Sequence, residues 1–167
     1  LFGCRYARQL YLLVMDILVR ELGFPTVLVF GRDHREAPLS CQASLGIELD
    51  LEQESLLMGG SGIVGHVVQT LEPYLCSDTS QDPYFDPDDY GTRSELVVPI
   101  RSGDFLWGLV VAIARRPGAY TLRDLETLTL VAGFLSVGLE NIANLDMLAR
   151  ELQLIRFLHG WVHELSG

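Results

Sequence analysis

Apolar side chains near the N-terminus recur at steps of three and four residues. They are Tyr6, Leu10, Leu13, Val14, Ile17 and Leu18. Side chains at this spacing lie on one face of a helix, so the pattern predicts an amphipathic helix over about residues 5–22. Gly23 and Pro25 follow and are expected to end it.

Four later stretches have the character of strands. Residues 27–30 are fully apolar, and residues 39–45 alternate in polarity, so a polar turn between them predicts a hairpin. Residues 96–101 and 105–114 predict two more strands, which Ser102-Gly103 joins. The segment 105–114 is apolar on both faces. We therefore expect it in the middle of a sheet that helices cover on both sides.

Two short helices are expected between the hairpin and the later strands. Asp50 is a candidate cap for a helix that carries Leu51, Ser55 and Leu56. A run of glycines interrupts this helix, and a second short helix is expected over about residues 63–70.

The C-terminal third of the chain predicts one long helix. Thr121 and Asp124 form a capping box, and no proline follows, which gives about 45 residues and a length on the order of 65 Å. Its first half carries apolar residues for the sheet: Leu125, Leu128, Val131, Ala132, Leu135, Leu139 and Ile142. Its second half has the spacing of a coiled-coil seam: Leu145, Leu148, Leu152, Ile155, His159 and Val162. We therefore expect a parallel homodimer that pairs through the N- and C-terminal helices.

Composition narrows the function. A chain of 167 residues suits one domain with a helical extension. Its formal charge of -10 would repel nucleic acid, so no nucleic-acid partner is expected. Lysine is absent, which removes the P-loop lysine, the Schiff-base lysine and the ATP-pairing lysine of kinases.

The cysteines and the hydropathy indicate the cellular compartment of the protein. Cys4, Cys41 and Cys76 are odd in number and widely spaced, which favours a reduced, cytoplasmic compartment over a disulfide scaffold. No run reaches about 18 uninterrupted apolar residues and no signal peptide is recognisable, so no membrane span is expected in this fragment. The chain begins at Leu1 without methionine, which suggests a piece of a longer protein.

Three motifs suggest ligand sites that their context argues against. Residues 60–65 read G-x-G-x-x-G, but a buried strand does not precede them, so a turn into a helix is favoured over a dinucleotide site. Asp86 and Asp88 suggest a calcium loop, but Val97 stands where that loop needs a glutamate. His66 has no second ligand nearby in sequence. No metal site is therefore expected.

An ordered set of segments resembles the GAF family of small-molecule-sensing domains. The set is Gly62-Ile63-Val64-Gly65, Asp78, Asp82-Pro83-Tyr84-Phe85, Ser94-Glu95-Leu96-Val97-Val98-Pro99-Ile100, a Gly108-centred strand, and Tyr120-Thr121 opening a helix. The resemblance implies an α+β fold with a central antiparallel sheet, helices on both faces and a long C-terminal signalling helix. It implies a sensory domain over residues 1–142, including the helix 5–22, and a coiled-coil signalling helix over 143–167.

The resemblance also implies a ligand site between the sheet and the segment 76–95. In that segment Tyr84, Phe85 and Tyr90 are candidates for an apolar wall, and Cys76, Asp78, Ser94 and Glu95 complete the candidate set. The alternative is that the aromatic residues only cover a loop. The residues identify neither the ligand nor a cofactor.

Three branches of the family do not fit. One reduces free methionine sulfoxide and carries Gly-x-Cys-Gly where this chain has Gly62-Ile63-Val64-Gly65, so with Cys76 alone in the loop we do not expect an enzyme. The cyclic-nucleotide branch requires a lysine, and the bilin branch a Cys-His pair that is absent here.

The C-terminus resembles the phosphoacceptor helix of sensor histidine kinases. Phe157-Leu158 is followed after four residues by His163-Glu164-Leu165. The resemblance implies that His163 is phosphorylated, that Glu164 is its acid/base neighbour, and that a kinase output domain follows in the parent chain. Alternatives are a GAF input to a cyclase, a phosphodiesterase or a transcription activator, and, less favoured, an enzyme like the methionine sulfoxide reductases.

Overall fold

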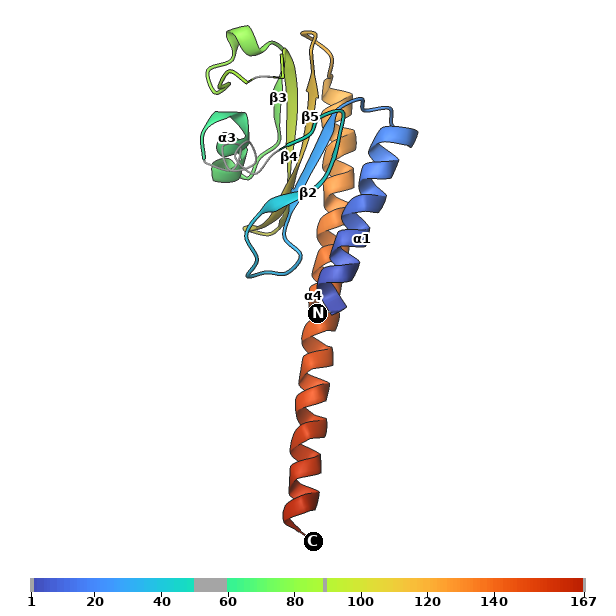
Figure 1. Cartoon of the computed structure of the whole chain (residues 1–167). Coiled ribbons are helices and arrows are strands. Elements are labelled where there is room, and N and C mark those ends of the chain that lie inside the picture. The colour runs from blue at the N-terminus through green and yellow to red at the C-terminus, as the bar shows by residue number, and fades with distance from the viewer. Residues whose placement is uncertain (1, 50–59, 89, 167) are drawn as a thin grey trace.

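A five-stranded antiparallel sheet forms the centre of the computed structural model, which describes residues 2–49, 60–88 and 90–166 (Figure 1). The strand order is β2-β1-β5-β4-β3. The strands are β1 (Val27–Gly31), β2 (Ser40–Leu45), β3 (Tyr74–Cys76), β4 (Ser94–Ser102) and β5 (Phe105–Ala114). The apolar strand β5 lies in the middle, as its sequence predicts, because only a central strand is buried on both faces.

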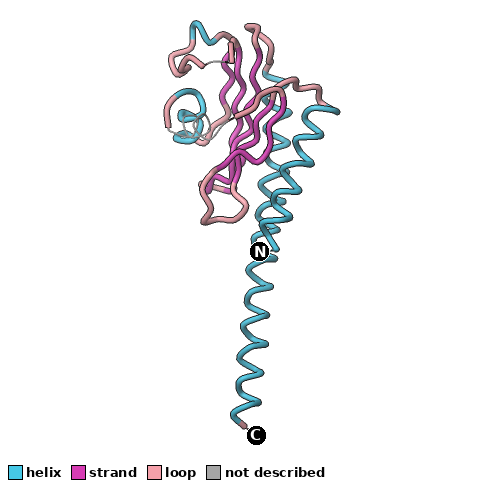
Figure 2. Tube along the Cα trace, viewed as in Figure 1, coloured by secondary structure: helices cyan, strands magenta, loops and turns pink. Residues whose placement is uncertain are grey.

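Helices cover the two faces of the sheet (Figures 1 and 2). One face packs against α1 (Phe2–Asp16), which continues as the π-helix η1 (Ile17–Glu21), and against the first half of α4 (Leu122–Leu165). The other face packs against α3 (Gly62–Thr70) and the loop that carries the 3-10 helix η2 (Thr79–Gln81). The predicted α+β fold, with an antiparallel sheet and a long C-terminal helix, is therefore confirmed.

Alternating residues of the central strands fill two separate cores. Leu96 and Val98 of β4 point toward α1 and α4, where Tyr11, Trp107 and Leu135 are buried. Val97 points to the opposite face, into the core beneath α3. Because neighbouring residues of one strand contact opposite layers, a shift of β4 would displace side chains in both layers.

Most predicted elements are found close to their expected bounds. The N-terminal helix starts earlier than expected, at Phe2, and its last turn is a π-helix. The short strand β3 and the turn η2 were not predicted. The expected helix with Leu51, Ser55 and Leu56 lies outside the described residues.

The helix α4 is continuous over 44 residues and begins with the predicted capping box. The Thr121 amide donates to Asp124 Oδ2 at 2.8 Å, and the Asp124 amide donates to Thr121 Oγ1 at 3.4 Å. Leu139 is its last fully buried residue, and from Met147 onward every described side chain is exposed. Figure 1 shows this half extending from the domain as a single rod.

The length and composition of α4 alone would also allow it to cross a membrane. Of its most apolar window, 28% is buried inside the domain. The expectation that these residues contain no membrane span stays a prediction.

Candidate functional site

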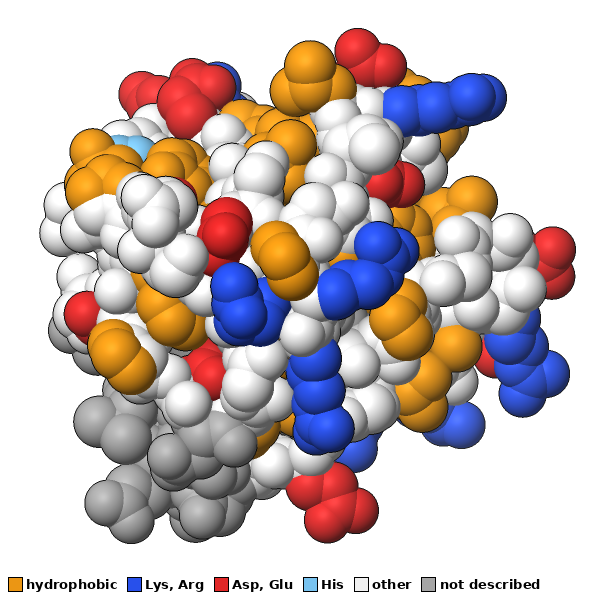
Figure 3. Space-filling view, turned by 90° about the horizontal axis from the view of Figure 1, so that it is seen from above, with side chains coloured by type: hydrophobic (Ala, Val, Ile, Leu, Met, Phe, Trp, Pro, Cys, Tyr) orange, Lys and Arg blue, Asp and Glu red, His pale blue; other side chains and the backbone are white. Residues whose placement is uncertain are grey.

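A cavity of about 280 Å³ lies between the sheet and α3. Its lining comes from β1, β4 and β5, from the start of α3 and from the loop before β4: Leu28, Ser61, Gly62, Ile63, Val64, Phe85, Asp86, Pro87, Asp88, Tyr90, Glu95, Val111 and Ile113. At this end of the molecule, acidic and arginine side chains are interspersed with apolar ones on the surface (Figure 3). An apolar lining with a few polar groups is the usual composition of a small-molecule site.

Glu95 is a buried carboxyl group in this cavity. It pairs with Ile113 on β5 and with Cys76 on β3, and it is only 7% exposed. Among the described residues, no hydrogen bond reaches its carboxyl group. Burial raises the pKa of Glu95 to about 8, and the charges of Asp88 and Asp82 add to the effect. At pH 7 this group is therefore mostly neutral.

Two further carboxylates line the cavity, and they differ from Glu95 in having local partners. The Asp86 carboxylate lies next to Gly62 at the N-terminus of α3, whose partial positive charge favours an anion. Asp88 Oδ1 accepts hydrogen bonds from the amides of Tyr90 at 3.0 Å and Thr92 at 3.3 Å. The described lining residues include three carboxyl groups and no arginine.

The three predicted aromatic residues separate into two groups. Phe85 and Tyr90 line the cavity. Tyr84 instead stacks on His66 of α3, with 3.9 Å between ring centroids. Tyr74 packs edge-on against both rings, and its hydroxyl donates to Asp82 Oδ2 at 2.7 Å. This cluster attaches the loop to α3.

Cys76 does not line the cavity, although it was a predicted site residue. Its side chain is 1% exposed and belongs to the core beneath α3. Burial raises the pKa of the Cys76 thiol to about 12, and the neighbouring Asp82 adds to the effect. The thiol therefore stays protonated at neutral pH.

Asp78 and Ser94 also lie outside the cavity lining, where they hold backbone in place. Asp78 Oδ1 accepts from the Ser80 amide at 3.0 Å and so caps η2. Hydrogen bonds from Ser80, and then the Arg93 guanidinium, lower the pKa of Asp78. The Ser94 hydroxyl donates to the Arg116 carbonyl at 2.8 Å.

A second hollow of about 550 Å³ adjoins the first and shares Tyr90 and Ile113 with it. Arg115, Arg116 and Thr92 are among its lining residues. The Thr92 hydroxyl is buried and has no hydrogen-bond partner among the described residues.

His163 and Glu164 lie far along α4, on its last turn, and both are exposed. The His163 ring is 4.9 Å from the His159 ring between centroids. The last turn of α4, which carries this pair, lies far from the sheet and its cavity (Figure 1).

Sequence reasoning missed Asp86, Asp88 and the start of α3 as cavity residues. The two aspartates were noticed only as parts of a calcium-loop pattern. The glycines of residues 60–65 were interpreted as a turn into a helix, yet Gly62, the first residue of α3, lines the cavity.

Comparisons with known proteins agree with the fold. The family model of the GAF domain matches residues 7–139. A type II free methionine-R-sulfoxide reductase from Thermoplasma acidophilum is 18% identical, with a TM-score of 0.68 over 83% of this chain and 96% of that one. The GAF-B domain of DevS from Mycobacterium smegmatis is 20% identical, with a TM-score of 0.61 over 85% and 98%.

A GAF domain from a phosphoenolpyruvate-protein phosphotransferase of Coxiella burnetii is 18% identical, with a TM-score of 0.60 over 84% of this chain and 94% of that one. At these identities the structural likeness shows the fold alone. No curated protein matches the chain.

Proposed function

Because the chain belongs to the GAF domain family, we propose that it is the sensory domain of a cytoplasmic signal-transduction histidine kinase. A small molecule bound beside Glu95 would bias α4, and α4 would pass that bias to His163. The observation that carries the proposal is a cavity with a buried carboxyl group on one face of the sheet, and the base of a long rod on the other.

The charges of the cavity favour a small cationic ligand. Glu95 is buried without a partner among the described residues, and Asp88 lies on the same lining. A ligand with an ammonium group would pair with Glu95 and lower its pKa, so the carboxyl group would ionise on binding. A volume of about 280 Å³ suits a small organic cation.

Transmission to α4 would use β4. Glu95 lines the cavity, while its neighbour Leu96 belongs to the core under α1 and α4. A ligand that moves Glu95 would therefore move Leu96 against the helices. The ligand can shift the helix only if it binds one arrangement more tightly than the other.

The exposed apolar side chains of the helical layer support a homodimer. They include Leu12 and Leu13 of α1, Ile17 of η1, and Leu130, Phe134 and Val137 of the first half of α4. The rod continues this surface with the predicted seam, whose apolar members Leu145, Leu148, Leu152, Ile155 and Val162 are each more than half exposed. So much apolar surface on a free helix favours pairing with a second copy.

The rod also carries a second apolar stripe, roughly 110° around the helix axis from the seam. It consists of Met147, Leu154, Leu158, Trp161 and Leu165. A two-stranded coiled coil buries only one stripe, so the second stripe is available for another helix. A bundle of more than two helices fits the proposed phosphoacceptor segment.

The assignment of His163 is tested by autophosphorylation of the longer protein that the proposal requires. His163→Gln should abolish incorporation of labelled phosphate from ATP. The control is Gln153→Ala, which changes an exposed position of the same rod outside the seam and should leave labelling intact. Labelling retained in His163→Gln would refute this role, as would equal loss in both variants.

The ligand class is tested with probes that share a four-carbon skeleton and carry a positive, neutral or negative head group. Calorimetric titration with n-butylamine, butanol and butyrate should detect binding of the amine alone. Glu95→Gln should weaken amine binding by about tenfold or more, because a buried ion pair loses one partner. Asp78→Asn, outside the cavity lining, is the matched control and should leave it unchanged. Preference for butyrate would refute the cationic class.

A catalytic role like that of methionine sulfoxide reductases is less well supported. Two structural neighbours are such enzymes by name. Here, however, Cys76 is buried and its thiol is kept protonated, whereas a nucleophilic cysteine needs an accessible thiolate. Turnover of free methionine sulfoxide that disappears in Cys76→Ser would reverse this ranking. A GAF input to another kind of output domain would keep the cavity and lose only the His163 chemistry.

A further inference from the structure

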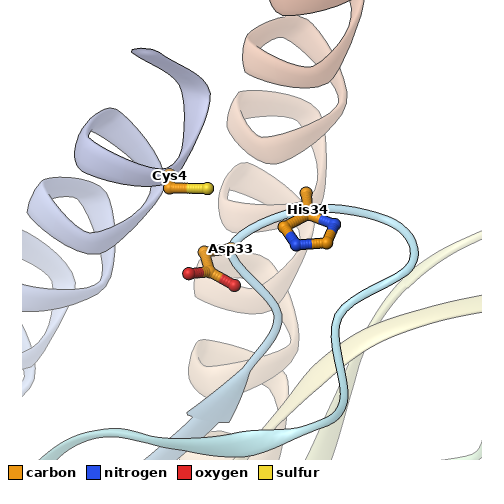
Figure 4. Close-up of side chains that lie close together, drawn as sticks. All are labelled: Cys4, Asp33 and His34. Atoms are coloured by element: carbon orange, nitrogen blue, oxygen red, sulfur yellow. The ribbon is translucent and has the colours of Figure 1, made fainter. Parts of the chain in front are cut away.

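Three side chains with metal-binding atoms converge beside the first turn of α1 (Figure 4). Cys4 comes from α1, and Asp33 and His34 come from the loop between β1 and β2. One atom from each, namely the sulfur, a carboxylate oxygen and a ring nitrogen, lie within 4.8 Å of one another. All three residues are half-buried, so an ion from solvent can reach them.

The orientation of His34 suits a metal ligand. Its Nδ1 lies 3.2 Å from Glu36 Oε2. In Figure 4 the other ring nitrogen is on the side of Asp33 and Cys4. A carboxylate that binds one imidazole nitrogen and leaves the other for the ion is the usual arrangement around metal-bound histidines.

We propose that Cys4, Asp33 and His34 bind a divalent transition-metal ion of the zinc type, with water in the fourth position. A thiolate and an imidazole select such ions over calcium and magnesium, which prefer oxygen ligands. Atoms around a tetrahedral zinc lie roughly 3.4–3.8 Å apart, given bonds of about 2.0–2.3 Å. The three side chains would therefore close by about 1 Å, a movement that half-exposed rotamers allow.

The position of the cluster gives such an ion a mechanical effect. The ion would link α1 to the β1–β2 loop. Both segments also contact α4: the Gly3 amide donates to Asp146 Oδ1 at 3.3 Å, and Arg35 pairs with Glu140. Binding would thus stiffen the part of the domain from which the rod extends. This effect does not depend on a ligand in the cavity beside Glu95.

Sequence spacing does not reveal this cluster, because Cys4 is far from Asp33 and His34 in the chain. No metal site was expected from the sequence, since the motifs considered there involved Asp86, Asp88 and His66. The fold places α1 beside the β1–β2 loop and so creates the cluster.

The experiment uses the full chain without an affinity tag, in a reducing buffer, after removal of metal with a chelator. Calorimetric titration with Zn²⁺ should show that one ion binds per chain. The bound ion should also raise the melting temperature of the chain. Co²⁺ should give the absorption band of a cobalt–thiolate bond. Cys4→Ser should abolish that band, and Cys4→Ser or His34→Ala should each weaken Zn²⁺ binding by about tenfold or more.

Matched variants separate this cluster from adventitious binding. Cys41→Ser and His66→Ala change a cysteine and a histidine outside the cluster and should leave the Zn²⁺ affinity unchanged. Glu36→Gln should weaken binding about tenfold, because it removes the partner that orients His34. Circular dichroism of each metal-free variant checks folding. The proposal would be overturned if the parent chain took up no Zn²⁺. It would also be overturned if Cys4→Ser and His34→Ala bound Zn²⁺ as tightly as the parent chain does.

Discussion

At the residue scale, the burial of Glu95 makes the stability of the domain depend on pH. Its pKa is about 8 in the folded chain and near 4.5 when unfolded. The folded state therefore holds a proton that the unfolded state releases, so stability falls as pH rises from 4.5 to 8. The upper limit is about 5 kcal/mol, since one pKa unit corresponds to about 1.4 kcal/mol.

Urea unfolding of the parent chain and of Glu95→Gln at pH 5 and pH 8 measures this effect. The parent should lose stability over that range relative to Glu95→Gln, which cannot ionise there. Comparing the two proteins cancels the titration of groups they share. A parallel pH dependence in both would show that Glu95 is not the cause.

Also at this scale, sequence reasoning found part of the candidate site. Phe85, Tyr90 and Glu95 were predicted and do line the cavity. Tyr84 was predicted with them, but its ring stacks on His66, because neighbouring loop residues point in different directions. Cys76 illustrates a second limit. Its pairing opposite Glu95 places it on the same face, and only the packing of α3 shows that it is sealed into the core.

At the element scale, β1 and β5 approach so closely that only glycine fits at Gly108. A Cβ there would lie 2.0 Å from the Phe30 carbonyl oxygen, and backbone cannot yield as a side-chain end can. Gly108→Ala should therefore destabilise the chain by about 2 kcal/mol or more. Gly133→Ala in α4, with nothing within 4 Å, should be neutral or stabilise by up to about 1 kcal/mol. Urea unfolding of both variants measures the contrast.

If Gly108→Ala were no less stable than Gly133→Ala, β1 and β5 would be able to separate at little cost. The packing of both sheet faces on this strand pair would then need another explanation.

The elements that the sequence predicted well are those with a long regular pattern. The strand β5 is ten residues long and the helix α4 is 44 residues long, so each offers a long pattern to recognise. The strand β3 has three residues and no alternation to detect, and only pairing with β4 makes it a strand. The π-helical end of the N-terminal helix likewise lacks a local signal, since the predicted stop at Gly23 fits either helix type.

At the scale of the whole molecule, the cavity and the rod lie on opposite faces of one sheet. The ligand-side core and the helix-side core share β4 and β5, so the sheet is the mechanical link between them. The proposed metal site lies at a third place, where α1 and the β1–β2 loop approach α4. A ligand in the cavity and an ion in the metal site would therefore both act on the layer formed by α1 and α4.

The helical layer should pair with a second copy of the chain through the coiled-coil seam of α4. A charged side chain in this seam should prevent the pairing. Leu152 is 54% exposed in the single chain and would be buried in a parallel coiled coil. Leu152→Asp should weaken dimerisation by about tenfold or more, because each chain loses a buried leucine worth about 1.5–3 kcal/mol and two like charges meet. The control is Gln153→Asp, which adds the same charge on a side of the rod outside the seam. Sedimentation velocity should show a dimer for the parent and the control, and a monomer for Leu152→Asp at equal concentration. A monomeric parent chain would separate the sensory fold from any dimeric transmission along α4.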